Sequence, residues 1–144
     1  MRHADQRVSR IVVLFEGLTP ADLPRLHGFY AEDARFKDPF NEVQGVAAIR
    51  AVFEHMYRAL AEPHFVVHEA VAEGDQCFLT WDFIFRLRQG DRREIVVRGA
   101  SHLLLADDGR IRVHRDYWDV AEELYEKLPL LGALMRWLKR RVNR

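Results

Sequence analysis

The chain has 144 residues, enough to bury one hydrophobic core, and its 49% hydrophobic and 31% charged residues are typical of a globular domain. Its 22 basic and 22 acidic residues cancel, so net charge gives no indication of a nucleic-acid partner. The single cysteine, Cys77, excludes an internal disulfide and a multi-cysteine zinc site. No apolar run approaches the ~20 residues of a membrane span and no secretory signal is recognisable, which predicts a cytoplasmic protein.

The first part of the chain has the apolar spacing of helices. Residues 6–18 carry apolar side chains three and four positions apart, which predicts a helix. Thr19 is a good N-cap and Pro20 a good first helical residue, so a second short helix is expected to about Tyr30. Residues 34–39 then read as a short strand that Pro39 ends.

Another helix is predicted before the apolar residues begin to recur at every second position. The helix covers residues 45–60 and has a buried stripe that includes Ile49 and Phe53. Alternating, aromatic and β-branched segments follow, and a helix with a break at Pro129 ends the chain. The expected strands are residues 64–74, residues 76–90, and a hairpin over residues 93–119 that turns at Asp107, Asp108 and Gly109; the last helix spans residues 120–142.

Helices followed by a meander of long antiparallel strands indicate an α+β fold. Helices that cover one face of a strongly curved sheet would leave a pocket between the two layers. We therefore expect one domain over residues 1–144, in which residues 121–144 form a C-terminal helical extension.

Two stretches resemble a known family, FYAEDARFKDPF with VQGVAAIRAVF after it, and DDGRIRVHRDYWD. They are similar to the NTF2-like superfamily, which includes ketosteroid isomerases, SnoaL-type polyketide cyclases and limonene epoxide hydrolases. The resemblance covers about residues 6–122. It implies a cone of N-terminal helices packed on a strongly curved, mostly antiparallel sheet that encloses one pocket for a small hydrophobic ligand. It also implies a homodimer that works without a cofactor or metal.

The isomerase pattern maps onto some of these residues. Asp38 falls on the family's general base, and Tyr30 on a tyrosine of the supporting hydrogen-bond network. The oxyanion tyrosine of the first helix has no counterpart, because Leu14 stands there. The second oxyanion donor aligns with Ser101 or His102, depending on the register of the hairpin.

The epoxide hydrolase pattern maps onto a different aspartate. HRDYWD resembles a motif of that family, so that Asp116 falls on one of its catalytic aspartates. The family's arginine and second aspartate align with Phe83 and Phe85, which can neither position a water nor protonate an epoxide. Epoxide hydrolysis is therefore not expected.

Strand alternation predicts which side chains share the pocket. An inward Asp116 brings His114 and Trp118 to the same face, and Trp81, Phe83 and Phe85 form one face of the central strand. The predicted catalytic residues are Asp38, His102 and Asp116. The predicted substrate-binding residues are Tyr30, Phe53, Trp81, Phe83, Phe85, His114 and Trp118.

Each polar candidate also has a simpler interpretation. Asp38 is either a base in apolar surroundings or a turn residue before Pro39. Asp116 could pair with a nearby arginine, and His102 could be a hydrogen-bonded core histidine. His102, His114 and Asp116 could also converge on a metal ion, but no tight ligand motif is present, so no metal is predicted.

The C-terminal helix combines an apolar stripe with the basic run RWLKRRVNR. The simpler interpretation is that it packs over the pocket mouth or on a dimer partner. The alternative is contact with an anionic membrane surface.

Two functional hypotheses follow from the sequence. The first is an isomerase-like or cyclase-like enzyme that moves a proton on a hydrophobic carbonyl compound, with Asp38 as base. The second is a non-catalytic domain that holds a small hydrophobic ligand in the same pocket. The missing oxyanion tyrosine favours the second, and the retained carboxylates favour the first.

Overall fold

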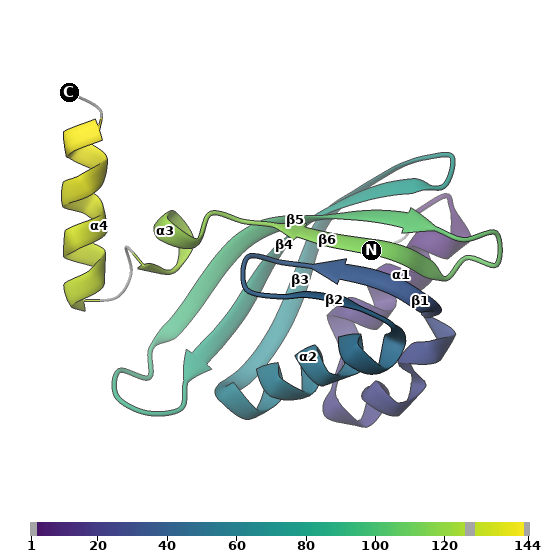
Figure 1. Ribbon diagram of the computed structural model, residues 1–144, viewed down its shortest axis with the longest axis horizontal. Helices are drawn as coiled ribbons and strands as arrows, with labels where there is room; N and C mark the ends of the chain where they lie inside the picture. The colour runs from purple at the N-terminus through teal and green to yellow at the C-terminus, as the bar shows by residue number, and fades with distance from the viewer. Residues whose placement is uncertain (1–2, 126–128, 143–144) are drawn as a thin grey trace.

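The computed structural model describes residues 3–125 and 129–142. Two helical segments come first, two strands separate them from α2, and four further strands and two helices follow (Figure 1). The helical elements are α1 (Gln6–Gly17), η1 (Pro20–Gly28), α2 (Val46–Ala59), α3 (Val120–Glu123) and α4 (Pro129–Val142). The strands are β1 (Tyr30–Lys37), β2 (Glu42–Gln44), β3 (Leu60–Glu73), β4 (Gln76–Leu87), β5 (Glu94–Leu105) and β6 (Ile111–Tyr117).

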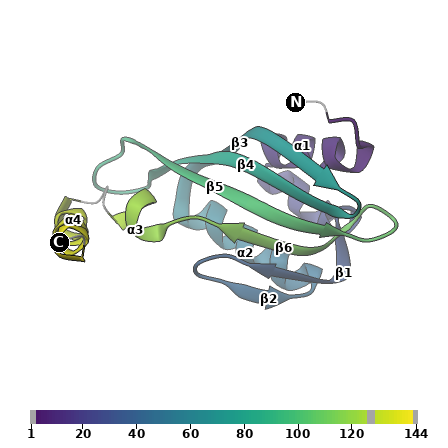
Figure 2. The ribbon, with the colours of Figure 1, turned by 90° about the horizontal axis from the view of Figure 1, so that it is seen from above.

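The strands form one curved sheet in the order β2-β1-β6-β5-β4-β3. Only the β1–β6 pair is parallel among these strands; the other neighbours are antiparallel. The helices α1 and α2 cover one face of the sheet, as the view from above shows (Figure 2). This arrangement confirms the α+β prediction and the curved, mostly antiparallel sheet.

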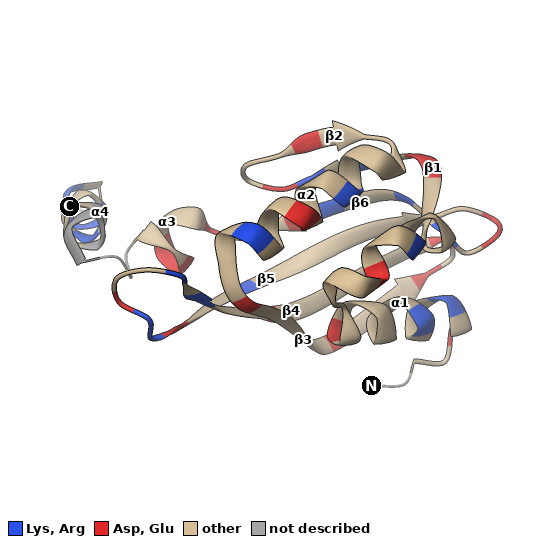
Figure 3. Cartoon of the chain, turned by 90° about the horizontal axis from the view of Figure 1, so that it is seen from below, with Lys and Arg blue, Asp and Glu red and all other residues tan. Residues whose placement is uncertain are grey.

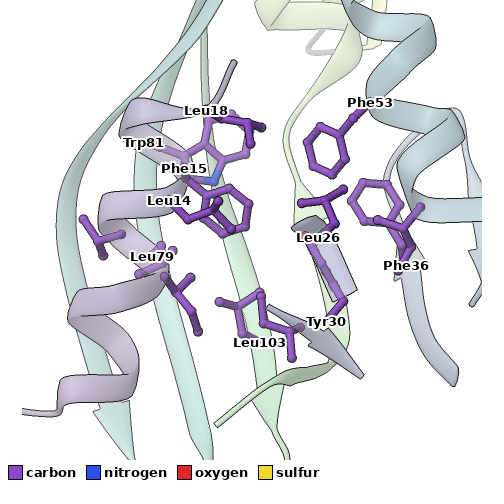
Figure 4. Close-up of a cluster of buried hydrophobic side chains, with 14 of the residues drawn as sticks. Leu14, Phe15, Leu18, Leu26, Tyr30, Phe36, Phe53, Leu79, Trp81 and Leu103 are labelled. Atoms are coloured by element: carbon purple, nitrogen blue, oxygen red, sulfur yellow. The ribbon is translucent and has the colours of Figure 1, made fainter. Parts of the chain in front are cut away.

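Alternation along the strands explains where the core forms. In β4 the side chains of Cys77, Leu79 and Trp81 are buried, whereas Phe78 between them is 45% exposed. The inward side chains meet the apolar faces of α1 and α2, including Phe15 and Phe53, in a continuous buried cluster (Figure 4). The period of two in the sequence thus places the core between helices and sheet.

Local signals set the helix starts. Asp5 caps α1 by accepting a hydrogen bond from the backbone N–H of Arg7 at 2.9 Å. The backbone N–H of Thr19 donates to the carboxylate of Asp22 at 2.8 Å at the start of η1. The predicted second helix is a 3-10 helix, because Pro24 lies inside it and lacks the N–H that an α-helix would use there.

The structure differs from the sequence prediction at several boundaries. β1 begins at Tyr30 rather than at residue 34, the short strand β2 was not predicted, and β3 begins directly at the end of α2. The helix predicted for residues 120–142 with a break at Pro129 is present as α3 and as α4, which begins at Pro129, and residues 126–128 lie outside the described residues. None of the described helices is long and apolar enough to cross a membrane.

Candidate functional site

Three neighbouring strands bring polar side chains together on the inner face of the sheet. His114 and Asp116 are two residues apart on β6, so both side chains leave the same face. Ser101 on β5 pairs in register with Asp116, and Trp81 on β4 lies one strand further along. Tyr30, the first residue of β1, approaches His114 from the other side.

These side chains form one continuous chain of hydrogen bonds. The hydroxyl of Tyr30 lies 2.7 Å from Nδ1 of His114, and Nε2 of the same ring lies 2.6 Å from Oδ1 of Asp116. The hydroxyl of Ser101 donates to that same Oδ1 at 2.6 Å. The indole N–H of Trp81 donates to the hydroxyl oxygen of Ser101 at 2.9 Å. Two branches of donors therefore converge on one oxygen of Asp116.

Burial keeps the hydroxyl of Tyr30 protonated. It raises the pKa of Tyr30 well above that of a free tyrosine, and the negative charge of Asp116 raises it further. When this phenol donates to Nδ1 of His114, the ring carries a proton on Nε2 and donates it to Asp116, and we infer this arrangement. Phe15 and Phe36 pack against the His114 ring, with centroids 5.6 and 4.7 Å away, and hold it in place.

The two carboxylate oxygens of Asp116 differ. Oδ1 accepts from both His114 and Ser101, whereas no group among residues 3–125 and 129–142 hydrogen-bonds to Oδ2. The side chain of Asp116 is 14% exposed and lines a small adjacent cavity. One oxygen thus orients the carboxylate while the other keeps its lone pairs for a bound molecule.

The adjacent cavity is small and mostly apolar. Its volume is about 20 Å³, which is space for about one water molecule. Aromatic and aliphatic side chains fill the rest of the interior between helices and sheet (Figure 4). A ligand larger than water therefore requires some of these side chains to move. The lining residues are Phe15, Phe53, Phe65, Val67, Leu79, Trp81, Ser101, His114 and Asp116.

A glycine makes room for the indole that ends the hydrogen-bond chain. Trp81 lies directly opposite Gly99 in the β4–β5 ladder. A Cβ on Gly99 would lie 2.4 Å from Cη2 of the Trp81 ring, closer than any van der Waals contact allows. The glycine therefore lets the indole lie flat across β5, where its N–H reaches Ser101.

His102 does not belong to this site, which corrects the sequence prediction. The register of β5 turns Ser101 inward, where it is 4% exposed, and turns His102 to the outer face. There the His102 ring stacks on Phe78 with centroids 4.4 Å apart and bonds to Gln76 at 2.7 Å. Ser101 is the residue at the position that the sequence left open.

Asp38 also lies outside the cavity lining, contrary to the expectation of a base in an apolar pocket. Its Oδ1 accepts hydrogen bonds from the backbone N–H groups of Phe40 at 2.8 Å and Asn41 at 2.6 Å. The side-chain amide of Asn41 contacts both carboxylate oxygens at 3.1 Å. The carboxylate therefore closes the turn between β1 and β2, the simpler of the two interpretations.

The predicted substrate-binding residues divide into three groups. Phe53, Trp81 and His114 line the cavity, and Tyr30 lies behind His114. Phe83 and Phe85 point to the inner side but lie further along β4, beside Phe65 rather than at Asp116. Trp118 lies past the end of β6, where its ring packs edge-on against Phe40 near the Asp38 turn.

Sequence reasoning missed four apolar lining residues: Phe15, Phe65, Val67 and Leu79. Phe15 was visible as part of the buried stripe of α1, but the sequence does not say which part of the sheet α1 covers. No three metal-binding side chains lie close enough to share an ion in the described part of the chain. Of the three residues that the sequence suggested as metal ligands, His102 lies on the opposite face of the sheet from His114 and Asp116.

Solved structures with this fold are numerous. A protein with a ketosteroid isomerase-like fold from Catenulispora acidiphila DSM 44928 is 18% identical, with a TM-score of 0.70, covering 85% of this chain and 92% of its own. A protein from Shewanella putrefaciens CN-32 described as a SnoaL-like polyketide cyclase is 19% identical, with a TM-score of 0.70 and coverages of 85% and 98%. An LEH-like epoxide hydrolase from M. tuberculosis is 16% identical, with a TM-score of 0.68 and coverages of 94% and 94%. At these identities the likeness is one of fold alone.

A search of the curated proteins gives no match. The sequence model of the SnoaL-like domain matches residues 12–114, well over half of the chain. This match begins within α1 and ends at His114, so it includes Tyr30, Trp81, Ser101 and His114, whereas Asp116 lies two residues beyond it. The protein therefore belongs to the SnoaL-like domain family, within the NTF2-like fold.

Proposed function

We propose that the protein is a cofactor-independent enzyme that moves a proton on a small hydrophobic carbonyl compound, with Asp116 as the base. The observation that carries the proposal is the asymmetry of its carboxylate. Oδ1 is held by two donors, Oδ2 has no hydrogen-bond partner among the described residues, and Asp116 lines the cavity. A base held in one orientation, with a lone pair directed at the substrate, is what general base catalysis requires.

The reaction would begin with transfer of a proton from a carbon next to a carbonyl group to Oδ2 of Asp116. The C–H electron pair becomes an enolate, and the carboxylic acid that forms can return the proton to the same or another carbon. As Asp116 loses its charge, the two hydrogen bonds on Oδ1 weaken, and they strengthen again when the proton leaves. His114 and Ser101 act as positioning residues because they hold the carboxylate and do not face the substrate directly.

The available donors limit the substrate class. Within the described cavity lining, the hydroxyl of Ser101, the indole N–H of Trp81 and the inferred Nε2–H of His114 are already used inside the chain. None of them remains to stabilise a developing oxyanion. A carbon acid that is already activated by two carbonyl groups needs least help of this kind. We therefore infer a 1,3-dicarbonyl compound, as in polyketide-like molecules, rather than a simple enone.

The expected homodimer is part of the same proposal. The outer face of the sheet exposes Phe78 and Tyr117, which are 45% and 48% exposed, and Val71, which is 62% exposed. Apolar side chains of this size on a sheet face favour contact with another protein surface. A second copy placed there would leave the cavity between helices and sheet accessible.

Deuterium exchange at the activated carbon of a 2-alkyl-3-oxo ester, followed by NMR in D₂O, tests the proposed chemistry. We expect the protein to accelerate exchange above the buffer rate, and Asp116→Asn to remove about 10²- to 10⁴-fold of that acceleration. Asp38→Asn is the matched control and is expected to keep it, because Asp38 closes a turn.

Two results would contradict this assignment. If Asp38→Asn loses the exchange activity and Asp116→Asn keeps it, Asp38 is the base. No acceleration by the unaltered protein, with any 1,3-dicarbonyl ester tried, would favour the ligand-binding hypothesis instead.

A further inference from the structure

The C-terminal helix α4 lies apart from the rest of the domain. Figures 1 and 2 both show it beyond α3, away from the sheet and from α1 and α2. Large apolar side chains on this helix are open to solvent: Leu134 is 50% exposed, Trp137 48%, Leu138 41% and Val142 82%. This much exposed apolar surface on one short element indicates a partner surface.

The described side chains of α4 segregate by type around the helix. Leu134, Leu138 and Val142 recur every four residues and share one face. Arg136 lies about 200° around the helix from Leu134, and Arg140 lies about 200° from Leu138. Both arginines are therefore on the opposite face. Lys139 lies near this basic face. The helix is therefore amphipathic, with one apolar face and one basic face.

The charge of α4 is of one sign. Pro129–Val142 contains four basic residues and no acidic residue, and three of the four are in its last turn. The described part of α4 carries blue and no red in Figure 3. Arg141 is the exception to the basic face: around the helix it lies between Leu134 and Trp137, on the apolar side, with its guanidinium 5.5 Å from the centroid of the Trp137 ring. An indole beside a cation is the arrangement that suits the boundary between acyl chains and headgroups.

The open clefts on the domain do not suit this basic helix. The cleft beside α1 is lined by Arg10 and Arg25 with one acid, Asp22. Two other clefts among the described residues carry more positive charge. The cleft at β1, β2 and β6 contains Arg35, Lys37 and Arg115 with Glu42, and the cleft beside α2 contains Arg50, Arg58 and Arg88 with Glu54. A basic helix docked in any of them, on its own copy or another, would meet like charges.

We propose that α4 is an interfacial helix that holds the domain on membranes containing anionic lipid. Its 14 residues span about 21 Å, shorter than the ~30 Å hydrocarbon core, so it lies in the plane of the interface and does not cross. The apolar face enters the boundary of the acyl chains, and the basic side chains meet the anionic headgroups. This attachment is independent of the chemistry proposed for Asp116.

Co-sedimentation of the full chain with vesicles tests the proposal. We expect binding to phosphatidylcholine vesicles that contain phosphatidylglycerol, and much weaker binding to phosphatidylcholine alone. Arg140→Gln removes one charge from the basic face and is expected to weaken binding about fivefold. Arg92→Gln removes one charge from an exposed arginine in the β4–β5 loop and is expected to leave binding unchanged.

Tryptophan fluorescence identifies the segment that binds. Phosphatidylglycerol vesicles should shift the emission to shorter wavelength, and Trp137→Phe should abolish the shift, because the other two tryptophans lie outside α4: Trp81 is buried in the core and Trp118 packs against Phe40. Equal binding to both vesicle types, binding to neither, or equal loss in Arg92→Gln and Arg140→Gln would overturn the proposal. A dimer that dissociates in Leu138→Asp, without vesicle binding by the unaltered chain, would assign α4 to contact between copies instead.

Discussion

Asp38 and Asp116 both have aromatic neighbours in the sequence, and the structure uses the two aspartates differently. Asp38 bonds to groups two and three positions further along the chain, so its environment is local. Asp116 bonds to His114 on its own strand and to Ser101 on the neighbouring strand, and through them connects to β1 and β4. The first carboxylate closes a turn with both oxygens engaged, whereas the second has one oxygen left for chemistry. The comparison teaches that aromatic neighbours in the sequence do not identify a base; the partners of each oxygen do.

The largest loss of stability is expected on substitution of Gly99, because the absence of a side chain there makes room for the Trp81 indole. Gly99→Val places carbon atoms inside the Trp81 ring and forces it away from Ser101. We expect the free energy of unfolding to fall by about 3 kcal/mol, at the upper end for overpacking. Denaturant unfolding measures this fall.

Gly17→Ala is the matched control for that substitution. Nothing lies within 4 Å of the added Cβ at Gly17, so its effect should be small and of either sign. If Gly99→Val costs no more than Gly17→Ala, the indole does not depend on the glycine and this explanation of its position is wrong.

A smaller effect is expected at the other end of the chain of hydrogen bonds. Tyr30→Phe removes the donor to Nδ1 of His114 and leaves a buried ring nitrogen without a partner. The expected loss in free energy of unfolding is about 2 kcal/mol. Tyr117→Phe, at a 48% exposed tyrosine, removes a hydroxyl of the same kind and should change stability little. Equal losses in the two variants would mean that the buried hydroxyl of Tyr30 contributes no more to stability than the exposed hydroxyl of Tyr117.

The arrangement of His114 and Asp116 was predictable because it depends on one strand. Two residues that are two positions apart on a strand share a face whatever the rest of the fold does, and the inward face follows from the apolar residues around them. The same reasoning gave the buried side chains of β4. Periodicity was likewise sufficient for the α+β fold, since helices and long strands differ in their apolar spacing over many residues.

The choice between Ser101 and His102 was not predictable, because it depends on register. The β5–β6 ladder has an irregularity between Leu104 and Leu105, and one residue of shift exchanges the two faces of a strand. The role of Phe15 depends on how α1 crosses the sheet, which is set by tertiary packing and not by the spacing within the helix.

The weakest effect on stability, and the sharpest test of the comparison, is expected at Asp38. Asp38→Ala removes the acceptor of two backbone N–H groups in the turn, at Phe40 and Asn41, where water can partly replace it. We expect a loss of about 1 kcal/mol in free energy of unfolding and unchanged exchange activity. Asp33→Ala, at an exposed aspartate of β1, serves as control and should stay within about 0.5 kcal/mol of the unaltered chain. If Asp38→Ala keeps its stability and loses its activity, the two aspartates have been assigned the wrong way round. A loss of stability with activity retained would establish that the same residue type closes a turn at one end of β1 and is available for proton transfer at the end of β6.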